Sequence, residues 1–195
     1  MRIFVALDID DAIRQRVLRF MEGVSGFAPD ARWVRPESLH VTLKFIGEKP
    51  PEAVAEIKQA LSSVGAERVD MNFRGYGFFP TAKAARVFWL GIESGPQLAA
   101  LAKAVDQALK ALSIPQEEHA FTPHLTLARG AGRSGAPHGK KGDAANRNFH
   151  RLQEKLAALT APEFGTMAAH EFFLYQSQLS QGGSRYTKIA SFPLT

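Results

Sequence analysis

A His-x-Thr-Leu tetrapeptide occurs twice in this chain, and its residue types are those of general acid–base chemistry. The copies, at 40–43 and 124–127, begin 84 residues apart. The unperturbed pKa of histidine lies nearest neutrality, so two imidazoles can divide the tasks of general acid and general base at physiological pH. Threonine hydroxyls can donate hydrogen bonds to an oxyanion. These groups suit phosphoryl chemistry without a metal.

Each copy begins a run of alternating residues, HVTLKFIG from residue 40 and HLTLARG from residue 124. Alternation of this kind is typical of a β-strand. Because strand side chains point to opposite faces with a period of two, His40 shares a face with Thr42, and His124 shares one with Thr126. We therefore predict two strands that each present an imidazole beside a hydroxyl.

The repeat distinguishes a catalytic pair from structural histidines. A lone histidine on a strand is more often a hydrogen-bonded structural residue, but here both copies are followed at the same offset by a residue able to hold a nucleotide, Phe45 and Arg129. In an in-line displacement at phosphorus, the acid and the base must approach from opposite sides. Two related lobes facing each other across a cleft supply that arrangement.

Composition limits the classes of function. The chain has 195 residues, of which 45% are hydrophobic and 22% charged, as in ordinary globular proteins. The absence of cysteine excludes disulfides, thiolate metal sites and a cysteine nucleophile. No apolar run approaches the ~18 residues of a membrane span, so we expect a cytoplasmic protein without membrane association. The net charge of +5 is compatible with a polyanionic ligand.

The hydrophobic periodicity predicts an α+β fold. We expect strands at 3–9, 69–79 and 86–92, besides the two histidine strands, and a hairpin at 166–194 around Gly182-Gly183. Helices are expected after Asp10 or Asp11, after Pro50-Pro51, after Ser94-Gly95-Pro96, and at 149–159. The order of elements around the second motif echoes that around the first. This predicts a single bilobal domain over 1–195, with two pseudo-symmetric lobes, each an antiparallel sheet backed by helices, and a central cleft.

The segment 130–147 is rich in glycine and basic residues. It can be a flexible basic flap over a nucleic-acid backbone or a solvated loop whose charges keep it soluble. The remaining histidines, His119, His138, His150 and His170, share no pattern and are expected at the surface. The two motif histidines have no acidic residue or third histidine nearby at ligand spacing, so no metal site and no cofactor are expected.

Several further segments carry a family resemblance over essentially the whole chain. They are RIFVALDI at the start, Trp33 ahead of the first motif, Phe79-Pro80, RVFWLGI, FTPHLTLAR and LYQSQLSQGGSRYTKI. With the paired motifs, the chain resembles the two-histidine phosphoesterase superfamily and, within it, the bacterial and archaeal RNA 2′,3′-cyclic phosphodiesterases, also known as 2′-5′ RNA ligases.

The resemblance implies hydrolysis of an RNA-terminal 2′,3′-cyclic phosphate to a 2′-phosphomonoester. His40 would be the general acid that protonates the O3′ leaving group, and His124 the general base that activates water. Thr42, Thr126 and Arg129 would hold the nonbridging oxygens. Phe45 would stack on the terminal base. The partner would be such an RNA end or a related nucleotide, with no obligate protein partner.

Other functions fit the same residues. Cleavage or joining of 2′-5′ linkages, or opening of a small cyclic nucleotide, would use the same pair of histidines. A non-catalytic module that binds RNA ends would also explain the basic charge, but it gives no reason for both histidines. The product formed from a cyclic-phosphate oligonucleotide distinguishes these alternatives.

The motif itself poses a geometric conflict. On a regular strand the residue five places after each histidine lies on the opposite face, so Phe45 and Arg129 would point away from the imidazoles. We therefore predict that each strand bulges, twists sharply or ends at 43–45 and 127–129, where Gly47 and Gly130 follow closely.

Overall fold

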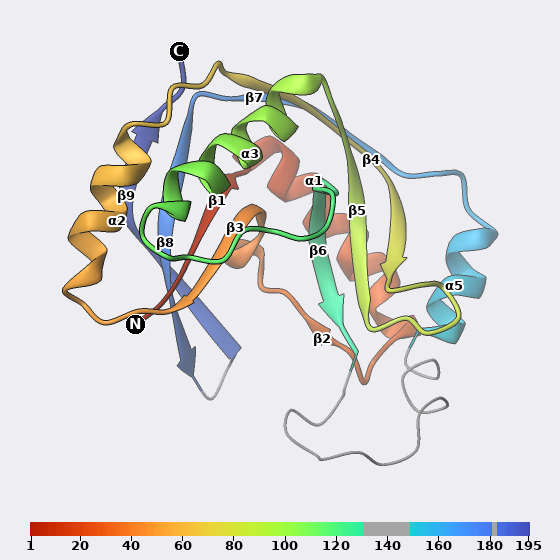
Figure 1. Cartoon of the computed structure of the whole chain (residues 1–195). Helices are drawn as coiled ribbons and strands as arrows, with labels where there is room; N and C mark the ends of the chain where they lie inside the picture. Colours follow the sequence, from red (N-terminus) through yellow and green to blue (C-terminus); the bar gives the residue numbers. More distant parts are fainter. Residues whose placement is uncertain (131–148, 181–182) are drawn as a thin grey trace.

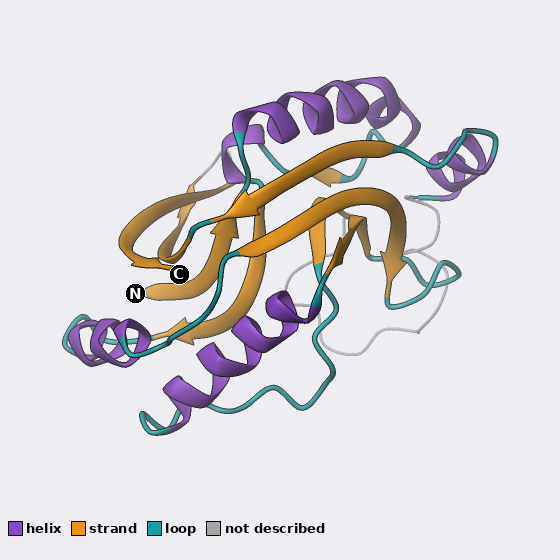
Figure 2. Ribbon diagram, turned by 90° about the horizontal axis from the view of Figure 1, so that it is seen from above, coloured by secondary structure: helices purple, strands orange, loops and turns teal. Residues whose placement is uncertain are grey.

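The computed structural model describes residues 1–130, 149–180 and 183–195. The described residues form two antiparallel sheets, and the helices lie on their outer sides (Figures 1 and 2). The first sheet has the strand order β3-β1-β8-β9, with β3 His40–Glu48, β1 Arg2–Asp8, β8 Glu171–Ser180 and β9 Gly183–Pro193. The second has the order β2-β6-β5-β4-β7, with β2 Arg32–Trp33, β6 His124–Arg129, β5 Val87–Ser94, β4 Val69–Phe79 and β7 Glu163–Ala169. The α-helices are α1 Asp11–Val24, α2 Ala53–Ser62, α3 Pro96–Lys110 and α5 His150–Ala157.

Each sheet combines strands from both halves of the chain. The first sheet takes β8 and β9 from the C-terminal half, and the second takes β4 and β5 from the N-terminal half. The helices cross over as well, because α1 follows β1 but contacts β7 of the other sheet, and α3 follows β5 but contacts β3. The predicted α+β fold with two helix-backed antiparallel sheets is confirmed, and its lobes are interleaved rather than consecutive.

Local sequence signals explain the helix boundaries. Asp10 caps α1, since its carboxylate accepts a hydrogen bond of 2.8 Å from the amide of Ile13. Pro96 occupies the first turn of α3, where its missing N–H costs no helical hydrogen bond. The helices bury apolar stripes in one continuous core that includes residues of both sheets.

Both histidine strands contain the predicted irregularity. In β3, Lys44 lies opposite Val5 and Thr42 opposite Ala6, so Leu43 is an extra residue between two register positions. In β6, Thr126 lies opposite Trp89 and Ala128 opposite Phe88, so Leu127 is the extra residue. A β-bulge shifts the alternation of faces by one residue. Leu43 and Lys44 are therefore both buried, and Phe45 returns to the face of His40.

A second bulge follows in β3. Phe45 lies opposite Phe4 and Gly47 opposite Ile3, which leaves Ile46 as the extra residue. Gly47 has a φ of +87°, a backbone conformation that residues other than glycine rarely adopt. The strand continues to Glu48, so the chain bulges at this position instead of ending.

Two details differ from the prediction. The hairpin comprises β8 and β9 only, because residues 166–169 belong to β7, which pairs with β4 in the other sheet. The two-residue strand β2 was not predicted, since two residues show no periodicity. Residues 131–147 of the predicted basic segment and Gly182 of the predicted turn lie outside the described residues. Within the described part of the chain, no helix is long and apolar enough to span a membrane.

The first bulge turns Lys44 into the protein, where only 3% of its side chain is exposed. Its ammonium lies 2.7 Å from Asp106 of α3, 3.2 Å from Glu117, and 2.6 Å from the carbonyl of Pro115. A buried charge is tolerated when it is paired and hydrogen-bonded. The ion pairs therefore tie the bulged segment of β3 to α3 and the loop that follows it.

We expect Lys44→Ala to lower the free energy of unfolding by about 3 kcal/mol, because Asp106 would keep a charge without its cation. Urea denaturation followed by tryptophan fluorescence measures the change. As a control, Lys110→Ala removes an exposed lysine of α3, the helix that carries Asp106, and should change the free energy of unfolding by less than about 0.5 kcal/mol. Equal losses for the two variants would show that the buried ion pairs do not hold this segment.

Candidate active site

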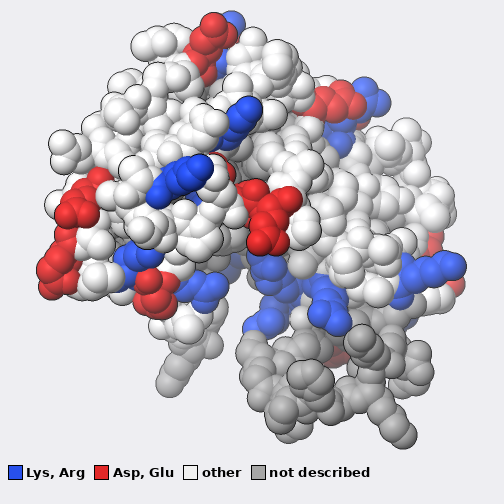
Figure 3. Space-filling model, viewed as in Figure 1, with Lys and Arg blue, Asp and Glu red and all other residues white. Residues whose placement is uncertain are grey.

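The two histidine strands meet where the sheets approach each other. Contacts between β3 and β6 link the sheets, and a cavity of about 700 Å³ opens there. Figure 3 shows a notch between the two halves of the molecule with blue basic side chains along it. All six predicted site residues line this cavity: His40, Thr42, Phe45, His124, Thr126 and Arg129. Their roles stay predictions, but the structure places them together.

The two histidines are held in the same way. His40 Nδ1 lies 2.7 Å from the carbonyl oxygen of Ser38, and His124 Nδ1 lies 2.7 Å from that of Thr122. A carbonyl oxygen only accepts, so Nδ1 must carry the proton in both rings. In the neutral form, Nε2 is then the nitrogen free to take a proton from a substrate or water. Each imidazole is fixed by the backbone two residues before it.

Aromatic side chains pack around both imidazoles. The His40 ring lies 4.8 Å from Phe4 and 5.1 Å, edge-on, from Tyr186, measured between ring centroids. His124 lies 5.0 Å from Phe79 and 6.1 Å from Trp89. The Trp89 ring covers the backbone of Gly77, where an added Cβ would lie 2.2 Å from it, so a glycine is required there.

This packing favours the neutral imidazoles. Loss of solvation lowers the pKa of His40 from its ordinary value of 6.5 to about 4, against the opposing effect of the Ser38 hydrogen bond, and the positive charge of Arg129 lowers it further. Burial and Arg129 also lower the pKa of His124. Without a ligand, both shifts favour the neutral imidazole over the charged form, and a bound anion would act in the opposite direction.

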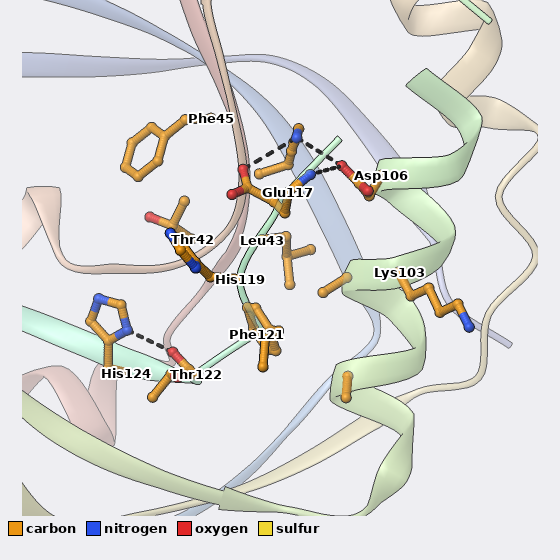
Figure 4. Close-up of a pocket in the computed structure, with 14 residues that line it drawn as sticks. Thr42, Leu43, Phe45, Lys103, Asp106, Glu117, His119, Phe121, Thr122 and His124 are labelled. Atoms are coloured by element: carbon orange, nitrogen blue, oxygen red, sulfur yellow. Dashed lines mark hydrogen bonds and ion pairs between the residues drawn. The ribbon is translucent and has the colours of Figure 1, made fainter. Parts of the chain in front are cut away.

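Phe45 separates two cavities. Its side chain is 57% exposed, although phenylalanine is usually buried, and it lines both the histidine cavity and a second pocket of about 620 Å³. Figure 4 shows this second pocket between β3, α3 and the loop before β6, with Phe45 at one side and Phe121 below. Thr42 and His124 line it too. It is thus a side chamber of the same site, with an aromatic ring at the junction.

Several residues of the site could not be identified by the motif. Further lining residues come from strands that are distant in sequence: Arg2, Phe4, Arg32, Ser177, Ser184 and Tyr186. All of them except Arg32 lie in the two terminal segments that carry the family resemblance, but nothing in those segments indicates which side chains face the cavity. The carbonyl groups that orient the histidines have no sequence signal, because any residue type supplies one.

The other histidines and the acidic residues are the chain's further candidate metal ligands. Among the described residues, no group of three or more His, Cys, Asp or Glu side chains is placed to hold a metal ion. His119, His150 and His170 are exposed, as predicted, and His138 lies outside the described residues. Asp8, opposite His40 in the register, forms ion pairs with Arg14 and Lys188, and its negative charge offsets part of the lowering of the His40 pKa.

Comparison with known proteins agrees with this site. The family described as "LigT like Phosphoesterase" matches residues 7–89 and again 90–186, one copy for each motif. The RNA 2′,3′-cyclic phosphodiesterase of Archaeoglobus fulgidus is 33% identical over 195 residues, covering 98% of this chain and 99% of that protein. The protein of the same name from Methanothermobacter thermautotrophicus is 30% identical and covers 99% of this chain and 98% of its own length.

Solved structures show the same architecture. The crystal structure of Escherichia coli LigT complexed with 3′-AMP has a TM-score of 0.77 and 25% identity, with 100% of this chain and 98% of that chain covered. The same protein complexed with phosphate has a TM-score of 0.72. The fold and the paired histidine motifs define a two-histidine phosphoesterase. The chain belongs to the LigT-like phosphoesterase family, which confirms the predicted resemblance.

We expect the C2 proton signals of His40 and His124 to titrate below pH 6.5 in NMR spectra of the free protein, with the pKa of His40 lower, near 4. Saturating inorganic phosphate should raise both pKa values, because an adjacent anion favours the imidazolium form. His40→Ala and His124→Ala assign the signals. An unshifted pKa for His40 in the free protein would contradict the role given to desolvation.

Proposed function

We propose that this chain hydrolyses the terminal 2′,3′-cyclic phosphate of RNA to a 2′-phosphomonoester without a metal or cofactor. The observation that carries the proposal is the pair of imidazoles at one cavity, each with Nδ1 bonded to a carbonyl 2.7 Å away. The names of the relatives support the substrate class. The continuous core through both sheets supports one bilobal domain over 1–195 as the catalytic unit.

The proposed reaction is an in-line displacement at phosphorus. His124 accepts a proton from water as the water oxygen bonds to phosphorus, and His40 gives a proton to O3′ as the P–O3′ bond breaks. The product carries a 2′-phosphate and a 3′-hydroxyl. Thr42, Thr126 and Arg129 hold the nonbridging oxygens, where negative charge must be stabilised.

The substrate supplies the electrostatic condition for this proton transfer. A general acid must be protonated, whereas burial and Arg129 favour neutral imidazoles in the free protein. The negative charge of a bound phosphodiester offsets the positive charge of Arg129 and raises the pKa of both imidazole rings. One imidazole can then carry the proton while the other accepts one, so binding and protonation are coupled.

The side chamber beside Phe45 suits the terminal base. An exposed aromatic ring at the entrance offers a stacking surface, and stacking tolerates any base. The cyclic phosphate of the same nucleotide would then reach the histidine cavity, since Thr42, Phe45 and His124 line both spaces. Phe45 would thus contribute to binding more than to the chemical step.

An oligonucleotide with a 2′,3′-cyclic phosphate end, incubated with purified protein in excess EDTA, tests the proposal. We expect a 2′-phosphate end, with activity unchanged by the chelator. A joined product would indicate 2′-5′ ligation instead, and tight binding without turnover would indicate an RNA-end binding module. Loss of activity in EDTA with recovery on adding a divalent ion would contradict the metal-independent mechanism.

We expect His40→Ala and His124→Ala each to lower the rate by about 10²- to 10⁴-fold, because each removes a proton-transfer group. Arg129→Ala should lose about 10²- to 10³-fold by removing a charge-stabilising donor. Phe45→Ala should raise KM more than it lowers kcat, since stacking acts on binding. Steady-state kinetics measure these effects, circular dichroism checks the fold, and His150→Ala, outside the cavity, is the control. If either motif variant keeps more than about a tenth of the rate, its assigned role is wrong.

A further inference from the structure

Three arginines line the histidine cavity, although the proposed reaction uses only Arg129. The other two are Arg2 and Arg32, and both are exposed. Resting on the proposed function, we propose that Arg2 and Arg32 bind the phosphate that joins the last two nucleotides of an RNA substrate. The cavity would then recognise two phosphates, the cyclic one at the histidines and its upstream neighbour.

Arg32 is placed beside Arg129 by strand pairing. The two residues are direct partners in the β2–β6 ladder, and Trp33 is paired with Ala128 next to them. Two hydrogen bonds hold β2 in place. The Trp33 indole N–H donates to the carbonyl oxygen of Ala28 at 3.0 Å, and the amide N–H of Val34 donates to the carbonyl oxygen of Leu127 at 2.8 Å. Like charges directly opposite each other destabilise a sheet. In the proposed complex, the cyclic phosphate at Arg129 and the upstream phosphate at Arg32 would offset this repulsion.

Arg2 approaches from the other lobe. It lies on β1, where the period of two puts its side chain on the face of Phe4, which contacts His40. Its direct partner on β8 is Ser177, whose side chain also lines the cavity. Its partner on β3 is Glu48, which does not line the cavity and forms an ion pair of 3.2 Å with the N-terminal ammonium instead. Arg2 and Arg32 thus belong to different sheets and line the same space.

The charge of the cavity exceeds that of one cyclic phosphate. No Asp or Glu is among the described residues that line it. Other arginines of the chain form ion pairs with carboxylates, namely Arg14, Arg35, Arg68 and Arg74. Within the described part of the chain, Arg2, Arg32 and Arg129 form none, and the same holds for Arg16, Arg19, Arg86, Arg151 and Arg185, which lie outside the cavity. A cyclic phosphodiester carries a single negative charge, so three guanidinium groups fit a ligand with a further phosphate.

The direction of the chain agrees with this placement. With the terminal base in the side chamber beside Phe45, the 5′ side of the same ribose must leave by another route. Arg2, Arg32 and Ser184 line the part of the histidine cavity that the side chamber does not share. The phosphate on the 5′ oxygen of the terminal nucleotide is the first group of the RNA chain that would lie in that part of the cavity.

Two dinucleotides that end in the same cyclic phosphate and differ in their internucleoside linkage test the proposal. One has a phosphodiester and the other a neutral methylphosphonate of the same shape. For the unmodified protein we expect kcat/KM to be roughly tenfold higher with the phosphodiester, the effect of one charge-assisted contact. Arg2→Gln and Arg32→Gln should each reduce this preference, and the double variant should bring it near one. Arg19→Gln, on the exposed face of α1 and outside the cavity, should keep it.

The outcomes separate this proposal from the proposed function. Equal kcat/KM for the two linkages in the unmodified protein, or arginine variants that lower both by the same factor, would overturn the second phosphate site. If no cyclic phosphate is hydrolysed at all, the proposed function fails. In that case the second phosphate site is tested by calorimetry, with two dinucleotides that carry a 3′-phosphate end and the same pair of linkages. A lower Kd for the phosphodiester that is lost in the Arg2→Gln and Arg32→Gln variants would support the site, and equal Kd values would contradict it.

Discussion

The β-bulge after each His-x-Thr sequence is the constraint on which the site depends. A strand alternates its faces, so it cannot present residues i, i+2 and i+5 to one cavity unless one extra residue lies between them. Leu43 and Leu127 are these extra residues, and the core on the opposite face buries both. The same shift puts Lys44 among the carboxylates of Asp106 and Glu117. Local backbone geometry, core packing and the composition of the cavity thus have one cause.

The interleaved fold keeps the two bulged strands in a fixed relation. If each lobe were formed by one half of the chain, a single connection would hold the histidines opposite each other. Instead, β4 and β5 of the first half build the sheet that contains β6, and β8 of the second half pairs with β1 beside β3. One core joins the two sheets. The proposed proton transfer tolerates little change in distance, and a core shared by both lobes suits this requirement.

Sequence periodicity was sufficient for the helices and for the strands other than β2 and β7, because these follow from local alternation. The irregularity of the two histidine strands followed from the shared face that the motif demands of His40 with Phe45 and of His124 with Arg129. The partition of strands between the sheets could not be predicted, since pairing of β7 with β4 depends on contacts across the whole chain. The hydrogen bonds that the two histidines donate to the carbonyl oxygens of Ser38 and Thr122 were not predictable either, because a carbonyl group is common to all residues. Arg2 and Arg32 belong to the cavity only through the pairing of β1 and β2 with other strands.

The burial of the imidazoles and the presence of three arginines in the cavity together determine where the site carries its positive charge. Desolvation lowers the pKa of each histidine, and the nearby Arg129 lowers it further, so the free site holds its positive charge on guanidinium groups. These groups remain charged under all ordinary conditions and attract an anion before any histidine is protonated. Once the anion is bound, its charge makes protonation of an imidazole favourable at a pH where the free protein resists it. In the proposed mechanism, the catalytic protonation state would therefore form with the substrate in place, and a neutral ligand would not produce it.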